Sequence, residues 1–372
     1  MNPYAAISAD SHVVEPPTLW TQRIDPALRA RAPRAVRRNG TDVLVCEDLS
    51  FPAYSLLAAA GKDSAALDPK GTFEESCPPG AWQPKARLAE MEADGVQAEV
   101  LYPSLAMRMF AIKDEPLQAA CFRAYNNWMA DFCTPYPDRL KGLGLIDLND
   151  IGAAIEEMRR CKRLGLAGAC VSISPDAEMP YDSAEYEPFW AAAAEMGMPL
   201  SLHVGTDRRP STQGSAAANV GYLVYRSIDH YIVEQAIATL IFSGVLHRHP
   251  RLRVVSAEND IGWSGYLVER MDYMFERRKN LTQLPIPRHT LPSEYFHRQV
   301  FLTFMRDRAG ILVRHLTGVN NLLWANDYPH TDSTWPDSQK VLDAMFEGVP
   351  SEERRKITVE NAAALYGFPA EY

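Results

Sequence analysis

Short apolar segments alternate with longer amphipathic segments through most of the sequence. The short segments are rich in β-branched and aromatic residues, as buried strands are, and the longer ones repeat their apolar residues at helical spacing. Strands are predicted at residues 4–9, 98–102, 140–145, 167–173, 199–203, 253–257, 300–304 and 321–325. Helices are predicted at residues 84–94, 116–134, 151–164, 185–196, 226–242, 263–278, 309–315 and 335–346. This alternation is typical of βα units around a parallel sheet.

Eight such units in a chain of 372 residues predict an α/β fold, a (β/α)8 TIM barrel, in a single domain of residues 1–372. The barrel itself needs about 250 residues, so the remainder fits insertions and long loops. The largest predicted insertion, residues 13–83, follows the first strand and is rich in Pro, Ala and small polar residues. We expect it to form a cap over the barrel mouth, with a hairpin near residues 38–45. Residues 352–358 and 359–366 are predicted to be helices on the barrel exterior.

The composition is that of a globular protein, with 47% hydrophobic residues, 23% charged residues and a net charge of −9. A nucleic-acid partner is not expected, because basic residues form only short runs such as residues 277–279. The six cysteines lack CxxC pairing, which argues against a zinc–thiolate site or a disulfide scaffold. The longest apolar run, residues 236–246, is too short to span a bilayer, and early acidic residues interrupt any signal core. We therefore expect a cytoplasmic protein without membrane contact.

Polar side chains stand where three of the predicted strands end. Asp10 and His12 follow the first strand, and His203 closes the fifth. Asp327 follows the eighth. Because barrel active sites lie at the C-terminal ends of the strands, these groups should meet at one mouth. Asp10 and His12 are two positions apart, so extended backbone points both to the same side. Two imidazoles with one or two carboxylates suit zinc, manganese or iron and leave a coordination position for water or substrate.

Each of these residues alone has a plainer interpretation. A single Asp near a strand end is more often a turn or helix cap, and an isolated His is more often a hydrogen-bonded core or rim residue. Their joint placement at three strand ends favours a metal site. The predicted fourth strand and its end, residues 167–174, contain no lysine that could be carboxylated to bridge two metals. We therefore expect one divalent ion per chain, Zn²⁺ in the first place, with Mn²⁺ or Fe²⁺ as alternatives.

Several longer motifs accompany these residues. They are Asp10-Ser11-His12, MEADGVQAEVLYPS (91–104), PLSLHVG (199–205), HPRLRVVSAENDIGW (249–263), DYPHTDSTWP (327–336) and Glu360-Asn361-Ala362-Ala363. Together they resemble the amidohydrolase-related metal-dependent enzymes, which include aminocarboxymuconate semialdehyde, γ-resorcylate and 5-carboxyvanillate decarboxylases. The resemblance covers nearly the whole chain. It implies that the metal ligands are Asp10, His12, His203 and Asp327, that Asp327 also transfers protons, and that the protein forms a homodimer or larger assembly.

The sequence departs from this family at the end of the predicted sixth strand, where Glu258 stands in place of a histidine. Glu258 could orient a metal-bound water, contact the substrate or become another ligand; its plainer interpretation is a partner for a nearby Arg or His. His330, three residues after Asp327, is a further candidate for the chemistry. It could donate to the substrate or support the Asp327 carboxylate, or it could simply cap its own loop.

Three arginines follow predicted strands two and five and could each hold a substrate carboxylate in a bidentate contact, although solvated surface arginine is more common. They are Arg108, Arg208 and Arg209. The remaining histidines are interpreted as structural: His230, His247, His249, His289, His297 and His315. Aromatic residues in the predicted cap and a nearby loop suggest an aromatic or cyclic ligand, although packing within the cap is the stronger interpretation: Trp20, Phe51, Tyr54, Trp82 and Phe110.

Two reactions on a small-molecule substrate fit the predicted site. In a carbon–carbon lyase, the metal binds a carboxylate and an adjacent oxygen, Asp327 protonates the carbon that bears the carboxylate, and carbon dioxide leaves. In a hydrolase, the metal lowers the pKa of bound water towards about 7, and hydroxide attacks an amide, imide, lactone or ester carbonyl. Both reactions need the same ligands, and the resemblance favours decarboxylation of a small aromatic or cyclic acid. A non-catalytic binding barrel is a third hypothesis, against which the complete ligand set argues.

Overall fold

The computed structural model describes residues 6–207 and 220–369, and its main sheet has eight parallel strands in the order β1-β5-β6-β7-β8-β9-β10-β11. The strands are β1 (Ala6–His12), β5 (Val96–Tyr102), β6 (Leu140–Leu145), β7 (Gly168–Val171), β8 (Leu200–His203), β9 (Val254–Ala257), β10 (Val300–Phe304) and β11 (Leu322–Trp324). Just beyond β11, the Asp327 N–H donates to the Asp10 carbonyl at 3.0 Å and the His12 N–H to the Tyr328 carbonyl at 2.7 Å. These bonds join the last strand to the first, and the predicted (β/α)8 barrel is confirmed.

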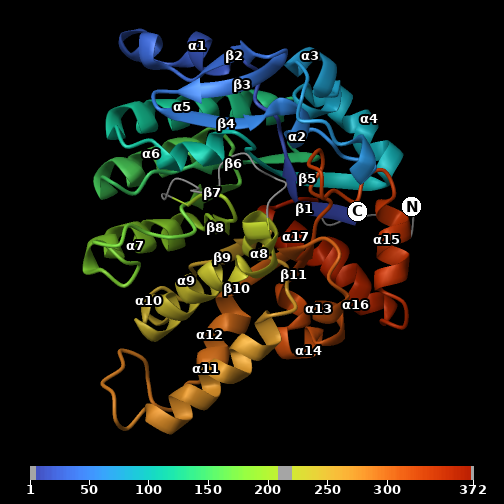
Figure 1. Cartoon of the computed structure of the whole chain (residues 1–372). Coiled ribbons are helices and arrows are strands. Elements are labelled where there is room, and N and C mark those ends of the chain that lie inside the picture. The colour runs from blue at the N-terminus through green and yellow to red at the C-terminus, as the bar shows by residue number, and fades with distance from the viewer. Residues whose placement is uncertain (1–5, 208–219, 370–372) are drawn as a thin grey trace.

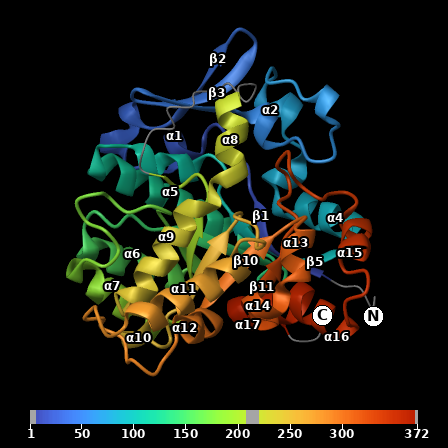
Figure 2. The ribbon, with the colours of Figure 1, turned by 60° about the horizontal axis from the view of Figure 1, so that its bottom comes forward.

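Helices surround the strands (Figure 2). Local sequence sets their bounds: α5 starts after Asp114, whose carboxylate accepts from the Leu117 N–H, and α4 ends at Gly95, whose φ is +73°. The outer helices are α4 (Pro84–Asp94), α5 (Glu115–Cys133), α6 (Ile151–Arg163), α7 (Glu187–Met196), α9 (His230–Phe242), α10 (Val245–Arg248), α11 (Ser264–Arg278), α12 (Pro292–Gln299), α13 (Arg308–Leu312), α14 (Arg314–Thr317) and α15 (Ser338–Met345). All seven residues of β1 are buried, as expected of a strand covered on both faces.

The segment between β1 and α4 forms a small antiparallel sheet with short helices beside it, seen in blue at the top of Figure 1. Its elements are α1 (Leu19–Arg23), β2 (Arg34–Arg38), β3 (Thr41–Cys46), β4 (Leu49–Ala53), α2 (Tyr54–Leu57) and α3 (Phe73–Ser76). The predicted hairpin is therefore part of a three-stranded sheet. Trp20, Phe51 and Tyr54 are buried in the hydrophobic core, so they pack the interior rather than line an open surface.

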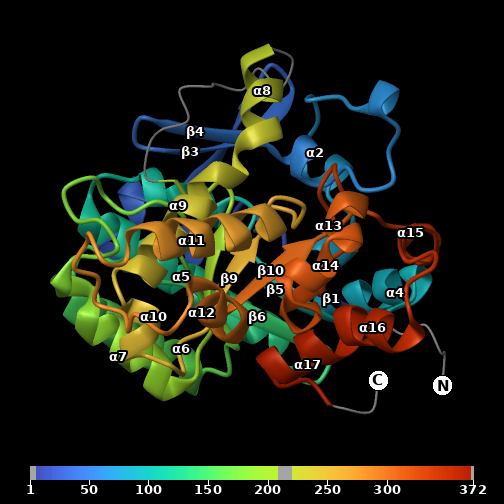
Figure 3. The same ribbon diagram turned by 90° about the horizontal axis from the view of Figure 1, so that it is seen from below.

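Some predicted helices differ from those observed. The helix predicted at 226–242 is two helices, α8 (Val220–Ile228) and α9, separated at Asp229, whose carboxylate accepts from Arg226 at 2.8 Å. Helical periodicity continues across this break, so the pattern alone does not reveal it. Figure 3 shows α8 extending from the same end of the barrel as the small sheet. The helix predicted at 309–315 is likewise two short helices, and α10 and α12 were not predicted. Among the described residues, no helix has the length and apolar character needed to cross a membrane.

The C-terminal segment consists of α16 (Ser351–Arg355), a π-helical turn (Lys356–Glu360) and α17 (Asn361–Tyr366). Asn361 attaches this segment to the barrel, because its Nδ2 donates to the carbonyls of Val319 and Leu322, each at 2.8 Å. The terminal motif that contains Asn361 therefore has a structural role: it fastens the last helices beside β11.

Candidate metal centre and active site

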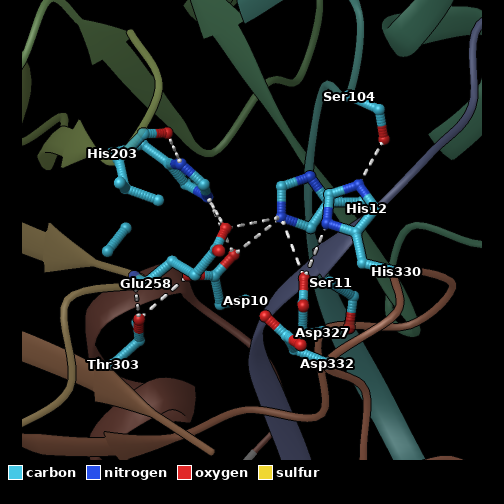
Figure 4. Close-up of polar contacts among 12 residues, drawn as sticks. Asp10, Ser11, His12, Ser104, His203, Glu258, Thr303, Asp327, His330 and Asp332 are labelled. Carbon is cyan, nitrogen blue, oxygen red and sulfur yellow. Dashed lines mark hydrogen bonds and ion pairs between the residues drawn. The ribbon is translucent and has the colours of Figure 1, made fainter. Parts of the chain in front are cut away.

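The four predicted ligands come from three strand ends and face one another (Figure 4). Asp10 and His12 lie within the last three residues of β1, which extends beyond its predicted end, and His203 is the last residue of β8. Asp327 follows β11 with a left-handed φ of +55°, a conformation that non-glycine residues seldom adopt and that often marks functional sites. All four side chains are buried.

The distances between these side chains are those of a shared binding centre. His12 Nε2 lies 3.4 Å from Asp10 Oδ1 and 3.3 Å from Asp327 Oδ1. His203 Nε2 lies 3.5 Å from Asp10 Oδ1. Asp10 and Asp327 also line one small cavity at the strand ends. The barrel thus brings together groups that are separated by more than three hundred positions in the chain.

The atoms that face the centre fit a divalent cation. Among the described residues, Asp10 Oδ1, His12 Nε2, His203 Nε2 and both Asp327 oxygens are buried without a hydrogen-bond partner. The Nδ1 atoms of His12 and His203 each donate to a backbone carbonyl at 2.7 Å, which leaves each Nε2 lone pair directed at the centre. Buried polar atoms without partners are costly, and a cation bound by nitrogen and oxygen donors would satisfy all of them.

Thr303, on β10, orients Asp10. Its hydroxyl donates to Asp10 Oδ2 at 2.9 Å, so Oδ1 is the oxygen left to face the centre. The same hydroxyl accepts from the Glu258 N–H at 2.9 Å and thereby connects two strand ends. Sequence patterns did not indicate this role, because a threonine within a predicted strand is common.

Glu258 faces the centre from the end of β9, also with a left-handed φ of +55°. Its Oε2 lies 3.6 Å from His203 Nε2 and 3.9 Å from His12 Nε2. Its other oxygen accepts from Arg226 Nη2 at 2.9 Å. Arg226, on α8, was missed by the sequence interpretation, since nothing distinguishes it there from a surface arginine near the start of a helix.

His330 contacts Asp327 through Nδ1, 3.0 Å from Oδ1. Its ring stacks on that of His12, with 3.9 Å between the ring centroids. His330 Nε2 lies 2.7 Å from the Ser104 hydroxyl, and that hydroxyl donates to the Val13 carbonyl at 2.7 Å. Because the hydroxyl proton is already directed at Val13, Ser104 accepts from Nε2–H, and the Nδ1 lone pair of a neutral His330 faces Asp327.

The environment shifts the pKa values of Asp10 and Asp327 in opposite directions. Burial raises the pKa of Asp10, but His203 and His12 lower it by more, so the pKa ends below its ordinary value. Burial and then the charge of Glu258 raise the pKa of Asp327 well above its ordinary value. Burial also lowers the pKa of His330 to about 4. The pKa values of the two aspartates are thus shifted in opposite directions, which makes Asp10 the stronger acid and Asp327 the weaker one.

Of the three arginines predicted to contact the substrate, the structure describes one, Arg108. Arg108 is exposed in the short 3₁₀ helix after β5, and its guanidinium lies against Gly205, two residues beyond His203. The φ of Gly205 is +82°, and a Cβ there would lie 2.7 Å from Arg108 Nη1, so only glycine permits this approach. Arg208 and Arg209 lie outside the described residues.

Five of the six other histidines contact residues away from the centre, as their structural interpretation predicts. Their partners are Trp263 and Glu234 for His230, Tyr295 for His247, Glu187 for His249, the Leu316 carbonyl for His297 and Glu353 for His315. None of these five joins the groups of metal-ligating side chains found among the described residues.

The amidohydrolase family model matches residues 51–368, most of the chain. The chain belongs to the amidohydrolase family. Asp10 and His12 precede the matched segment. γ-Resorcylate decarboxylase of Rhizobium sp. (strain MTP-10005) is 27% identical over 298 residues, which cover 75% of this chain and 86% of that protein. The 2-amino-3-carboxymuconate-6-semialdehyde decarboxylase of Dictyostelium discoideum is 26% identical over 298 residues, covering 78% of this chain and 77% of that protein.

Solved structures of amidohydrolases share the fold. An amidohydrolase from Mycobacterium avium subsp. paratuberculosis K-10 aligns over 99% of this chain and 100% of its own, with a TM-score of 0.77 and 21% identity. A dihydroxybenzoic acid decarboxylase from Polaromonas sp. JS666, solved with manganese and the inhibitor 2-nitroresorcinol, aligns over 98% of this chain and 97% of its own. Its TM-score is 0.65 and its identity 19%. The predicted membership of a metal-dependent enzyme family is confirmed.

Proposed function

We propose that this amidohydrolase removes carbon dioxide, without oxidation, from a small aromatic or cyclic carboxylic acid. The observation that carries the proposal is the contact of Asp327, itself a candidate ligand, with His330, Oδ1 to Nδ1 at 3.0 Å, because it gives a protonatable carboxyl group at the metal centre a hydrogen-bonding partner. The decarboxylase names of the relatives similar to this chain support the same reaction class.

In this proposal Asp10, His12, His203 and Asp327 hold one divalent ion. When bound, the ion supplies Lewis-acid polarisation of the substrate carboxylate and a neighbouring oxygen. Of the three predicted ions, the manganese in the Polaromonas structure supports Mn²⁺, whereas Zn²⁺ is supported by donor chemistry alone. Glu258 adds a carboxylate oxygen beside the ligands, which favours a dication over a monovalent ion.

The proposed proton path uses residues of this chain. Asp327 delivers a proton to the carbon that bears the substrate carboxylate. The bond between that carbon and the carboxylate then breaks, its electron pair returns to the ring, and carbon dioxide leaves. The lone pair of His330 Nδ1 is placed to accept from the carboxylic acid of Asp327, and Ser104 keeps the His330 ring in that orientation. Solvent replaces the proton that Asp327 gives to the substrate carbon. Arg226 orients Glu258, and Arg108 stays our candidate for contact with a polar substituent of the substrate, as do Arg208 and Arg209.

The test is decarboxylation in D₂O. The purified protein, loaded with Mn²⁺ or Zn²⁺, would be incubated with a panel of hydroxybenzoic acids that includes 2,6-dihydroxybenzoate and 5-carboxyvanillate. We expect carbon dioxide release and one deuterium on the carbon that carried the carboxylate, detected by NMR. A matched panel of lactones, imides, esters and amides tests the alternative. Opening of one of these with no decarboxylation would make the protein a hydrolase, and tight metal binding with neither reaction would support a binding barrel.

We also propose that the chain forms a homodimer or larger assembly. Exposed apolar side chains gather on α8 and the start of α9, at spacings that place them along one side: Val220, Leu223, Val224, Ile228 and Tyr231. The proposed partner for this surface is a second copy of the chain. Arg226, on the same helix, donates to Glu258 in the site, so an interface on α8 would also hold Arg226 in place. The cytoplasmic location stays a prediction.

A further inference from the structure

Arg87, on α4, is a buried cation that lies outside the candidate site but binds the backbone of two site segments. Its side chain is fully buried and pairs with the equally buried Glu99 of β5, Nε to Oε2 at 2.5 Å. Its Nη1 donates to the His12 carbonyl at 2.8 Å, and its Nη2 donates to the Tyr328 carbonyl at 3.2 Å. Burying an arginine is costly, so a fully buried one with a partner at each nitrogen has a defined task in the fold.

The two carbonyls lie on either side of the barrel's closing seam. There the Tyr328 carbonyl accepts from the His12 N–H, and the Asp327 N–H donates to the Asp10 carbonyl. Three of the four candidate ligands therefore stand on this seam, and one comes from the opposite end of the chain. Arg87 adds a bond to each side, and its guanidinium also packs over the Tyr328 ring, 4.5 Å from the centroid.

We propose that the Arg87–Glu99 pair is a positioning element of the metal centre: it keeps the His12 and Asp327 segments at the spacing that lets both side chains bind one ion. The inference rests on the proposed metal-dependent function. Glu99 fixes the plane of the guanidinium through Nε, and that plane directs the two Nη atoms at the two carbonyls. A lysine ammonium carries the same charge but no rigid fork, so it cannot reproduce the three contacts together.

The alternative is a buried ion pair that only stabilises the fold. The two roles differ in measurable ways. A merely stabilising pair changes the melting temperature of the metal-free protein and leaves the metal affinity of the folded protein unchanged. A positioning pair changes the metal affinity even where the protein remains folded, because misplaced ligands bind the ion less well.

The experiment compares Arg87→Lys with the wild-type full-length chain. Mn²⁺ binding is measured by calorimetry, and the geometry of the bound ion by electron paramagnetic resonance. We expect the Kd for Mn²⁺ to rise about 10- to 100-fold and the spectrum to broaden. Arg159→Lys is the matched control, since Arg159 forms an exposed ion pair with Glu156 of the same helix, α6, and the substitution should leave both readouts unchanged. If Arg87→Lys does not fold, the double variant Arg87→Met/Glu99→Met removes both charges together and is expected to weaken Mn²⁺ binding similarly.

A wild-type Kd and spectrum in the folded Arg87 variants, with only a lower melting temperature, would overturn the proposal. This outcome is distinct from failure of the proposed reaction. Wild-type protein that binds Mn²⁺ but decarboxylates nothing would contradict the function and leave the positioning role to be judged on Kd. Wild-type protein that binds no divalent ion would overturn both.

Discussion

Asp327 connects several groups of the candidate site: its carboxylate meets His12 and His330, and its backbone N–H bonds to Asp10. Replacing it with asparagine keeps the size and one oxygen but removes the protonatable group. We expect Asp327→Asn to lower kcat by at least about 10²-fold, the lower end of a general acid–base contribution, while most of the metal is retained. Single-turnover kinetics together with metal analysis check this. If Asp327→Asn kept a near-wild-type kcat, Glu258 or His330 would have to be the residue that transfers the proton.

Glu258 stands where the family resemblance leads us to expect a histidine. Its Oε1 is held by Arg226 and its Oε2 faces His203, which suits an orienting group better than a mobile proton carrier. We expect Glu258→Gln to reduce kcat by less than Asp327→Asn, because the amide keeps an oxygen towards the centre. Parallel kcat and KM measurements on the two variants decide this. A loss of about 10²-fold or more for Glu258→Gln would assign it to proton transfer.

At the scale of elements, Glu15 holds the loop after β5. Its buried carboxylate accepts from the N–H groups of Ser104, Leu105 and Ala106, at 3.2, 2.9 and 3.0 Å. This loop carries Ser104, the partner of His330, so the conformation of the loop affects the orientation of His330 in the site.

Glu15→Ala leaves three buried N–H groups without an acceptor. We expect it to lower the free energy of unfolding by at least about 2 kcal/mol, since each unsatisfied buried group costs about 1–3 kcal/mol. Urea denaturation measures the loss, with Glu269→Ala as the control, since Glu269 is an exposed residue of α11. A change below about 0.5 kcal/mol for Glu15→Ala would mean that water replaces the carboxylate at this loop.

At the scale of the whole molecule, metal binding should stabilise the barrel, because the ligands come from β1, β8 and the segment after β11. A ligand at 100 times its Kd adds about 2.7 kcal/mol to the free energy of unfolding. We expect Mn²⁺ or Zn²⁺ to raise the melting temperature by at least about 2 °C, and a chelator to reverse this. Differential scanning calorimetry checks it, with His203→Ala as a variant that should lose most of the shift. An unchanged melting temperature in saturating metal would contradict the metal centre.

The assembly prediction also belongs to the whole molecule. Replacing Leu223 and Val224 of α8 with lysine puts two charges on the apolar side of the helix. We expect the wild-type chain to sediment as a dimer or larger species at micromolar concentration and the double variant to shift towards the monomer. Monomeric wild-type protein would contradict the proposal, and a dimeric double variant would place the interface elsewhere.

Apolar periodicity and the position of a residue after a strand are local properties, so the barrel and the strand ends that carry the ligands could be predicted from the sequence. Boundaries were predicted less well: β1 extends to His12, and helical periodicity continues across the break at Asp229, so the pattern did not reveal it. The contacts that orient the site, in contrast, depend on how the chain folds. The Thr303 hydroxyl is 293 positions from Asp10, and Ser104 is 226 positions from His330. Such pairs meet because the barrel closes its last strand on its first, and no local pattern of residues records which side chains will meet there.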